Sequence, residues 1–333
     1  MGRELASALA APWRVVLVVR DDTPVAGGNW QSAARLAGAL RRRGTEARVA
    51  RLSERPAADV LHAFHAWATA APLLDLGVDP ARLVVTWTGT DLAALDSPAS
   101  LHRVGTLSRA AHHTVLTRAA RDRLAAAAPG WRVSHIPPGV DTGQFRPGPP
   151  AEASARLHLL LVGAGRRVKR PLCAVELVSA LWAAGIEARL TVTGPPRDSA
   201  LWTALTAQAQ IHPWLTLVEE VEPAAMPGWY RRADVVLNVS ETEGLSNALL
   251  EGMASGVPPA VVDIPGNRAL VEAGHTGLVF RTQPEFVAGI AALVRDPAFR
   301  GRMGAAARTY VMAHHNVERE ADAFSALYRR VAS

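Results

Sequence analysis

Two carboxylates stand on either side of a predicted helix start in SETEGLSNALLEGMASG, residues 240–256. The apolar run before this segment is typical of a strand, so Glu243 is expected in a loop and Glu251 in the second turn of a helix. Ser246 or Asn247 would cap that helix. Its first N–H groups favour an anion such as phosphate, whereas carboxylates accept hydrogen bonds from hydroxyl groups. An anion site flanked by two hydroxyl acceptors suits a nucleotide sugar, with the ribose at one glutamate and the hexose at the other.

The ordinary alternative is a solvated loop glutamate followed by a glutamate on an exposed helix face. Glu251, however, lies in an apolar segment with the small neighbours Gly252 and Ala254. Small residues permit close packing around a side chain, which favours a specific role for Glu251.

A second candidate group is VGAGRRVKRP, residues 162–171, which follows another apolar run. It contains Lys169, the only lysine beside 35 arginines, and Arg166 three residues earlier. A guanidinium fork and a compact ammonium group can together bind a diphosphate. Arg167 competes with Arg166 for this role, and we prefer Arg166. The alternative is an ordinary basic loop that opens a helix.

Two weaker signals lie in the first half of the chain. VAGGNW, residues 25–30, offers close backbone approach at its glycines. It is not the G-x-G-x-x-G pattern of dinucleotide-binding proteins, and it also fits an ordinary turn between strand and helix. His62 and His65 end a predicted strand and are expected to face one cleft, with structural and functional roles equally open.

The sequence favours a site without metal. No D-x-D triplet occurs in the chain, and no further Cys or His stands at the spacing of a zinc site. Arg166, Lys169 and a helix N-terminus would take the place of a cation at the phosphates. We therefore expect no metal and no cofactor beyond the nucleotide sugar.

Strand-like runs alternate with helical patterns, which predicts βαβ units and parallel sheets. The predicted strands are 13–20, 59–64, 82–87, 113–117, 157–165, 188–194, 215–220, 233–240 and 258–263. Amphipathic stretches such as 31–43 and 118–128 lie between strands, and helices end the chain over 284–332. The fold class expected is α/β, with two doubly wound Rossmann-like domains facing across a cleft and functional residues just after the strands.

The Pro- and Gly-rich stretch 136–154 separates the two series of strands. We predict an acceptor domain over 1–140, a linker over 141–153 and a nucleotide-sugar domain over 154–333. The last helix is a candidate to pack back on the N-terminal domain.

Composition restricts the protein class. The chain has 333 residues, 49% of them hydrophobic, and a formal charge of +6. It shows no membrane-spanning run or signal peptide, and its single Cys173 fits a reducing compartment, so a cytoplasmic location is expected. The basic excess is scattered, and its densest cluster, Arg41–Arg43, ends a predicted helix. No nucleic-acid partner is expected, while peripheral membrane contact stays open.

The segment EGLSNALLEGMASG, 243–256, resembles the signature of retaining family 4 glycosyltransferases (glycosyl transferases group 1), which have the two-domain GT-B fold. SHIPPGVDTGQF, 134–145, is similar to the family's crossover, and the resemblance is strongest over 157–280. GNRALV, 266–271, and the short N-terminal half resemble a subgroup that contains the glycosyltransferase-1-domain-containing protein of animals and the bacterial selenosugar synthases.

The resemblance implies roles for individual residues. Glu251 would hold the ribose hydroxyls, Glu243 would lie against the donor sugar, and the cations would neutralise the diphosphate. The family's later histidine is replaced here by Thr88 in TGTD, 88–91, so Thr88 or His65 would take over its role. The implied catalytic residues are Arg166, Lys169, Glu243 and His65. The implied donor-binding residues are Gly27, Gly28, Gly244, Leu245, Ser246, Asn247 and Glu251. The implied acceptor-binding residues are Asn29, Thr88 and Asp91.

The function that follows is a retaining transfer of a hexose or N-acetylhexosamine from a nucleotide diphosphate sugar, with UDP favoured, to a small acceptor. The subgroup adds the hypothesis of a sulfur or selenium nucleophile. Two alternatives stay open on this sequence: a nucleotide-sugar epimerase or isomerase of the same fold, and a non-catalytic nucleotide-sugar sensor.

Overall fold

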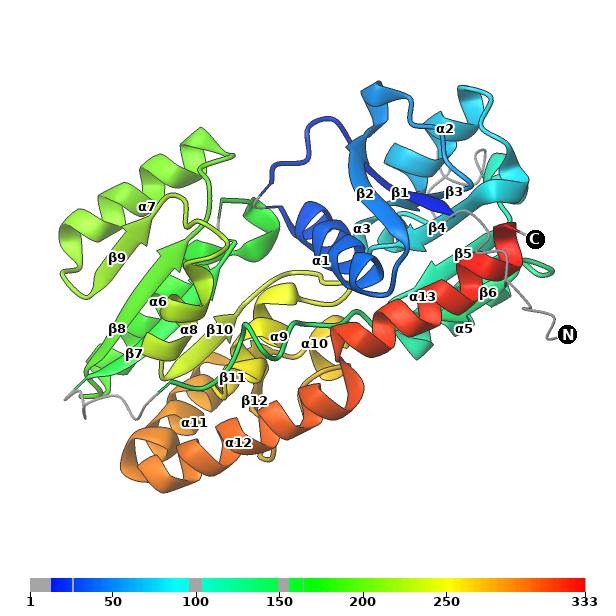
Figure 1. Ribbon diagram of the computed structural model, residues 1–333. Helices are drawn as coiled ribbons and strands as arrows, with labels where there is room; N and C mark the ends of the chain where they lie inside the picture. The colour runs from blue at the N-terminus through cyan, green and yellow to red at the C-terminus, as the bar shows by residue number, and fades with distance from the viewer. Residues whose placement is uncertain (1–12, 26, 96–103, 149–155, 164, 333) are drawn as a thin grey trace, which may run out of the picture. The chain divides into compact units, whose positions relative to one another are not determined.

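The computed structural model describes residues 13–25, 27–95, 104–148, 156–163 and 165–332. The chain divides into two compact units, one made of Met1–Ile136 with Glu318–Ser333 and the other of Pro137–Val317 (Figure 1). The last helix is therefore grouped with the first unit.

The first unit contains a six-stranded parallel sheet in the order β2-β1-β3-β4-β5-β6. Its strands are β1 Arg14–Val19, β2 Glu46–Arg51, β3 Val60–Phe64, β4 Leu83–Trp87, β5 His112–Val115 and β6 Val133–His135. Its helices are α1 Gly28–Arg42, α2 Ala71–Asp75, α3 Thr90–Ala93, α5 Arg118–Ala127 and α13 Val317–Ala332, with the short turns Leu52–Glu54, Ala66–Ala70 and Pro80–Arg82.

The second unit contains another six-stranded parallel sheet, in the order β12-β11-β10-β7-β8-β9. Its strands are β7 Leu157–Val162, β8 Ala188–Thr193, β9 Leu215–Val218, β10 Val235–Asn238, β11 Pro259–Val262 and β12 Leu278–Phe280. Its helices are α6 Pro171–Ala183, α7 Ser199–Ile211, α8 Met226–Arg232, α9 Asn247–Ala254, α10 Pro265–Arg268, α11 Gln283–Arg295 and α12 Pro297–His314, with a short turn at Arg167–Lys169.

Alternation along the central strands explains why both faces of the second sheet are covered. Val235 and Leu237 enter one apolar cluster, which includes side chains of α6, α7 and α11. Val236, between them, enters the other cluster with side chains of α8, α9 and α12. Because both faces are buried, the strands are continuous apolar runs, which is why they were predictable.

The prediction of two doubly wound α/β units is confirmed, although three strands were missed. β2 is an edge strand in a charged segment, with four of its six residues exposed or half-buried, and β6 and β12 have three residues each. Such strands lack the long apolar run on which the sequence prediction relied.

The segment predicted as a linker, 141–153, lies within the second unit as far as it is described, since 149–155 fall outside the described residues. Val140 pairs with Asn316 in an isolated bridge. Phe145 is 7% exposed and packs against Tyr230 with ring centroids 5.8 Å apart. In the division into two compact units, the chain passes from the first to the second at Ile136–Pro137 and returns at Val317–Glu318.

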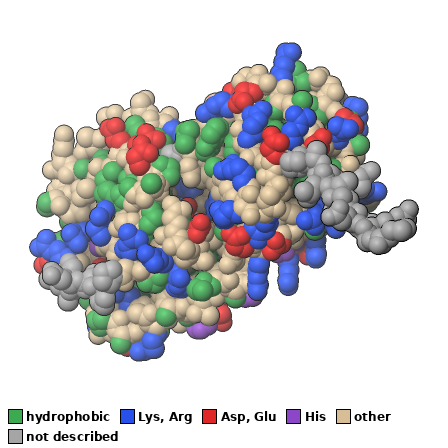
Figure 2. All heavy atoms as spheres, in the orientation of Figure 1, with side chains coloured by type: hydrophobic (Ala, Val, Ile, Leu, Met, Phe, Trp, Pro, Cys, Tyr) green, Lys and Arg blue, Asp and Glu red, His purple; other side chains and the backbone are tan. Residues whose placement is uncertain are grey.

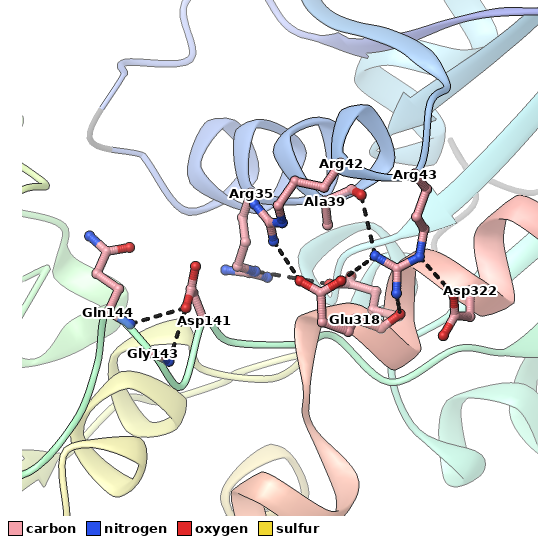
Figure 3. A network of polar contacts seen from close by, with 10 residues as sticks. Arg35, Ala39, Arg42, Arg43, Asp141, Gly143, Gln144, Glu318 and Asp322 are labelled. Carbon is pink, nitrogen blue, oxygen red and sulfur yellow. Dashed lines mark hydrogen bonds and ion pairs between the residues drawn. The ribbon is translucent and has the colours of Figure 1, made fainter. Parts of the chain in front are cut away.

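The arginine cluster at the end of α1 holds α13 within the first unit (Figure 3). Arg42 donates to the Glu318 carboxylate at 2.6 Å, and Arg43 donates to the Glu318 carbonyl and to Asp322, both at 2.7 Å. These arginines lower the pKa of the Glu318 carboxyl, Arg42 most strongly. The cluster therefore does more than complement the helix dipole.

Acidic and basic side chains both occur across the face drawn in Figure 2. Several arginines are paired with carboxylates, such as Arg156 with Glu187 at 2.6 Å. Within the part of the chain that is described, none of the helices is long and apolar enough to cross a bilayer.

Candidate functional site

The loops that follow β7 and β10 are joined in the second unit. The two strands are neighbours in the parallel sheet, so their carboxyl ends lie at the same edge. The Glu241 N–H donates to the Val168 carbonyl at 2.8 Å and links the two loops. The first loop is itself tightly packed, because a Cβ added at Gly165 would lie 1.7 Å from the Pro195 carbonyl oxygen.

Lys169 and Glu243 form an ion pair at this junction, and each side chain is 11% exposed. The Glu243 carboxylate also accepts from the Ser240 hydroxyl at 2.8 Å and from the Asn238 amide at 3.2 Å. Burial by itself would raise the pKa of Glu243, but Lys169, Ser240 and Asn238 together lower it below its ordinary value. Glu243 is thus an oriented, ionised carboxylate.

The two arginines of the same loop differ in their surroundings. Arg167 pairs with Asp198, which also caps α7 by accepting from the Leu201 N–H at 2.9 Å. Arg166 is exposed and has no side-chain partner among the described residues. The geometry therefore favours Arg166 over Arg167 as a ligand for an anion. Ala164 of this motif lies outside the described residues.

Glu251 lies in the second turn of α9 and is held by a buried tyrosine. The Tyr230 hydroxyl, from α8, donates to the Glu251 carboxylate at 2.8 Å. Burial, reinforced by Glu251, raises the pKa of Tyr230 well above its ordinary value, so Tyr230 stays a neutral donor. Gly252 permits this packing, since a Cβ there would lie 2.5 Å from Val236.

Ser246 occupies the N-cap of α9, as predicted, but its side chain does not cap the helix. Ser246 as a whole is 3% exposed, and its hydroxyl oxygen accepts a hydrogen bond from the Asn238 amide at 3.4 Å. Asn247 is the first helical residue, and the half-buried Gly244 and Leu245 lead into the cap.

In the first unit, Gly27 is the N-cap of α1 and Gly28 and Asn29 begin its first turn. Gly27 has extended backbone angles and provides no side-chain cap. Ala26 of this motif lies outside the described residues. Their contact with donor or acceptor stays a prediction.

His65 has a strained backbone, with φ at 96° in a non-glycine residue. Its Nδ1 accepts from the Ala68 N–H at 3.2 Å, and its Nε2 lies 3.4 Å from the Thr90 hydroxyl. An accepting Nδ1 assigns the proton to Nε2. Burial lowers the pKa of His65, against the effect of Asp91, so the neutral ring prevails near pH 7.

Asp91 organises the loops after β3 and β4. Asp91 is 0% exposed. Its carboxylate accepts hydrogen bonds at 2.8–3.0 Å from four backbone N–H groups, those of Ala66, Thr88, Gly89 and Leu92. These bonds occupy the carboxylate that was predicted to orient the acceptor. Thr88 itself is half-buried, and its side-chain role stays a prediction.

The expectation that His62 faces the same cleft as His65 is wrong. His62 is 0% exposed, with Nδ1 2.5 Å from the Tyr328 hydroxyl and Nε2 2.6 Å from the Thr86 hydroxyl. Burial lowers the pKa of His62 to about 3. It belongs to a polar chain inside the first unit that also helps to hold α13.

Three residues near the candidate site were missed by sequence reasoning: Tyr230, Asn238 and Asn267. Asn238 could have been recognised from the sequence, because it is a polar residue that ends an otherwise apolar strand. Tyr230 and Asn267 could not have been recognised in this way, because their contacts with Glu251 and Asn238 join segments that are distant in the sequence.

Two further observations delimit the site. Within the described ranges, no group of three or more His, Cys, Asp or Glu side chains could hold a metal ion. A pocket of about 480 Å³ lies in the second unit and is lined by Asp263, Arg268, Val271, Ala273, Val279, Arg281 and Glu285. None of the predicted site residues lines it, and its arginines are bound to Asp263.

The fold is that of GT-B glycosyltransferases. Sucrose-phosphate synthase from Thermosynechococcus elongatus superposes with a TM-score of 0.78 at 18% identity, covering 96% of this chain and 99% of that one. Anabaena HepE in complex with UDP-glucose gives a TM-score of 0.75 at 14% identity, over 96% of this chain and 100% of that one.

Residues 156–296 match the family described as Glycosyl transferases group 1. Glycosyltransferase 1 domain-containing protein 1 of Xenopus tropicalis is 31% identical over 175 residues, 52% of this chain and 51% of that protein. D-inositol 3-phosphate glycosyltransferase of Arthrobacter sp. is 31% identical over 185 residues, 51% of this chain and 44% of that protein. The chain thus spans about half the length of these curated relatives.

Proposed function

We propose that this protein is a retaining glycosyltransferase that moves a hexose or N-acetylhexosamine from a UDP-linked donor to a small acceptor. The observation that carries the proposal is the meeting of Lys169, Glu243 and the start of α9 at the carboxyl ends of neighbouring strands. A cation and a helix start suit a diphosphate, and an ionised carboxylate suits sugar hydroxyls. The group 1 match includes all of these residues, and HepE, with the same fold, was solved with UDP-glucose.

Lys169 would serve two anions at once. Its ammonium group has three donors, so it can keep its bond to Glu243 and still donate to a phosphate oxygen. Arg166, on the same loop, would add a second cation as the nucleotide diphosphate departs. Donors aimed at the charge that develops on a leaving group lower the barrier, and each charge-assisted bond contributes roughly 1.5–3 kcal/mol.

Glu251 would bind the ribose, with Tyr230 holding one carboxylate oxygen and thus orienting the group. The donor sugar would lie at Glu243. No metal takes part in this proposal, because Lys169, Arg166 and the start of α9 supply the positive charge. For retention, the acceptor would attack from the face that the diphosphate leaves, with the leaving phosphate as its base.

Ligand-dependent thermal unfolding tests the donor site. A nucleotide at 100 times its dissociation constant stabilises by about 2.7 kcal/mol, which shifts the melting temperature by several degrees. We expect such a shift with UDP rather than with GDP or ADP. Glu251→Ala should lose the shift because the ribose loses its hydroxyl acceptor.

The matched control is Glu187→Ala, which removes a surface glutamate of the same unit whose side chain is 53% exposed. It should keep the UDP shift. Absence of a shift with every nucleotide for the wild-type protein would contradict the donor site.

Product analysis tests the reaction itself. With UDP-α-glucose and a panel of hydroxyl, thiol and selenium nucleophiles, we expect an α-linked product, identified by the NMR coupling of its anomeric proton. A β-linked product would refute retention. Isomerised sugar formed without any acceptor would support the epimerase alternative, and binding without turnover would support a sensor.

A further inference from the structure

A buried chain of amide groups leads from α10 to Glu243. Asn267, on α10, is 0% exposed, and Asn238, at the end of β10, is 6% exposed. The Asn267 amide nitrogen donates to the Asn238 side-chain oxygen at 3.3 Å. The Asn238 amide nitrogen in turn donates to the Glu243 carboxylate at 3.2 Å.

Backbone groups at both ends fix the direction of this chain. Asn267 must point its nitrogen at the Val262 carbonyl, which only accepts, and that bond is 2.9 Å long. Asn238 must point its oxygen at the Ser240 N–H, which only donates, at 3.1 Å. With both amides so oriented, Asn238 presents a donor to Glu243; a reversed amide would present an oxygen to the carboxylate.

The side-chain oxygen of Asn267 is buried without a hydrogen-bond partner among the described residues. A buried acceptor left unpaired is destabilising. Turning the Asn267 amide would place this oxygen against the Val262 carbonyl oxygen and the Asn238 side-chain oxygen, which both accept, so the observed direction is retained. The adjoining Gly266 packs closely against the backbone of Glu243, because a Cβ added at Gly266 would lie 2.3 Å from the Glu243 carbonyl oxygen.

We propose that Asn267 is a positioning residue for transfer: through Asn238, it holds the Glu243 carboxylate in the orientation that receives the donor sugar. The role rests on the proposed function, whereas the underlying coupling between Asn267 and Glu243 can be measured in the protein without any substrate. Asn267 touches neither the sugar nor the diphosphate in this role. It acts by reinforcing, together with the Ser240 N–H, the direction of the Asn238 amide.

The test variant is Asn267→Leu, whose side chain has the same number of heavy atoms, branched at the same atom, and no donor. Neither acceptor is orphaned, because Val262 O still accepts from the Ile264 N–H at 3.0 Å and Asn238 still accepts from Ser240. The first readout is the pKa of Glu243, followed by NMR of side-chain carboxyl carbons in the ligand-free protein and assigned with Glu243→Gln. The second is the separation of kcat from KM in sugar transfer.

We expect Asn267→Leu to raise the pKa of Glu243, because the Asn238 oxygen then keeps only the Ser240 N–H as a donor among the described residues, and the less firmly held amide donates less well to the carboxylate. The kcat should fall about tenfold with KM for the donor within about twofold, as for one lost charge-assisted bond. The melting temperature should stay near that of wild type. Thr276→Val is the control: it removes a buried hydroxyl that accepts from the Glu272 N–H at 2.8 Å, and it should move neither readout.

An unchanged Glu243 pKa would overturn the proposal, as would a fall in kcat that follows a fall in melting temperature. If Asn267→Leu does not fold, Asn267→Asp replaces the donor by an acceptor in the same shape; failure of both to fold would show a structural role and also overturn it. If the wild-type protein transfers no sugar, the proposed function fails while the titration still decides whether Asn267 controls Glu243.

Discussion

Lys169→Met is expected to abolish sugar transfer and to lower the melting temperature by about 6–12 °C at neutral pH. The reason is that Glu243 would keep its buried position and lose its cation, since both side chains of the pair are 11% exposed. Removing one partner of a buried pair costs about 3 kcal/mol or more. Calorimetry on the variant measures the stability, and transfer assays measure the activity.

The pH dependence of this effect has a defined sign. In the wild-type protein the pKa of Glu243 is lowered, so its contribution to stability is present above the unfolded pKa and is lost as pH falls through the folded value. In Lys169→Met, burial is no longer opposed by the ammonium group, and the pKa of Glu243 should rise above its ordinary value. The difference in stability between the two proteins should therefore shrink on acidification.

The double variant Lys169→Met with Glu243→Gln separates stability from function. It removes both charges, so most of the lost stability should return while transfer stays absent. Additive losses of stability in the double variant would show that the two groups are not coupled. Recovery of transfer would contradict the role of Lys169 at the diphosphate.

Gly165→Ala is expected to lower stability by about 3 kcal/mol and transfer by about 100-fold. A methyl group there would lie 1.7 Å from the Pro195 carbonyl oxygen, so backbone has to move in one loop or the other. Gly165 lies in the loop that carries Lys169, and a displacement of about 1 Å at a reacting group can account for such a loss of rate. Denaturant unfolding and steady-state kinetics measure the two effects.

Gly301→Ala is the matched control. Gly301 is exposed in α12, and a Cβ there meets nothing within 4 Å. Alanine should stabilise an exposed helix position by up to about 1 kcal/mol and leave transfer unchanged. If Gly165→Ala behaves like this control, the packing of the loop against Pro195 is not a constraint on the site.

Local patterns were sufficient for much of the fold. The buried strands β1, β3, β4, β5 and β7–β11 are apolar runs between turn residues, and their alternation with helices predicted two parallel sheets. The same patterns placed Glu243 in a loop and Glu251 in the second turn of α9. The small residues around Glu251 predicted close packing, and Gly252 indeed lies against Val236.

Local sequence patterns could not predict contacts between segments that are distant along the chain. Lys169 and Glu243 are 74 positions apart, and they meet because β10 pairs with β7 rather than with β9. Strand order likewise brings Asn267 within hydrogen-bond distance of Asn238. The fold also places Arg167 in an ion pair with Asp198.

The sequence by itself determined the α/β class, the strand–loop–helix setting of both glutamates and the resemblance to group 1 glycosyltransferases. Tertiary structure alone decided that Lys169 pairs with Glu243 and that Tyr230 orients Glu251. It also decided that His62 and Asp91 are buried and hydrogen-bonded inside the first unit. The physical reason is that periodicity reports which face of an element is buried. The partner of a polar side chain depends on strand order and register, which are set by the packing of the whole sheet.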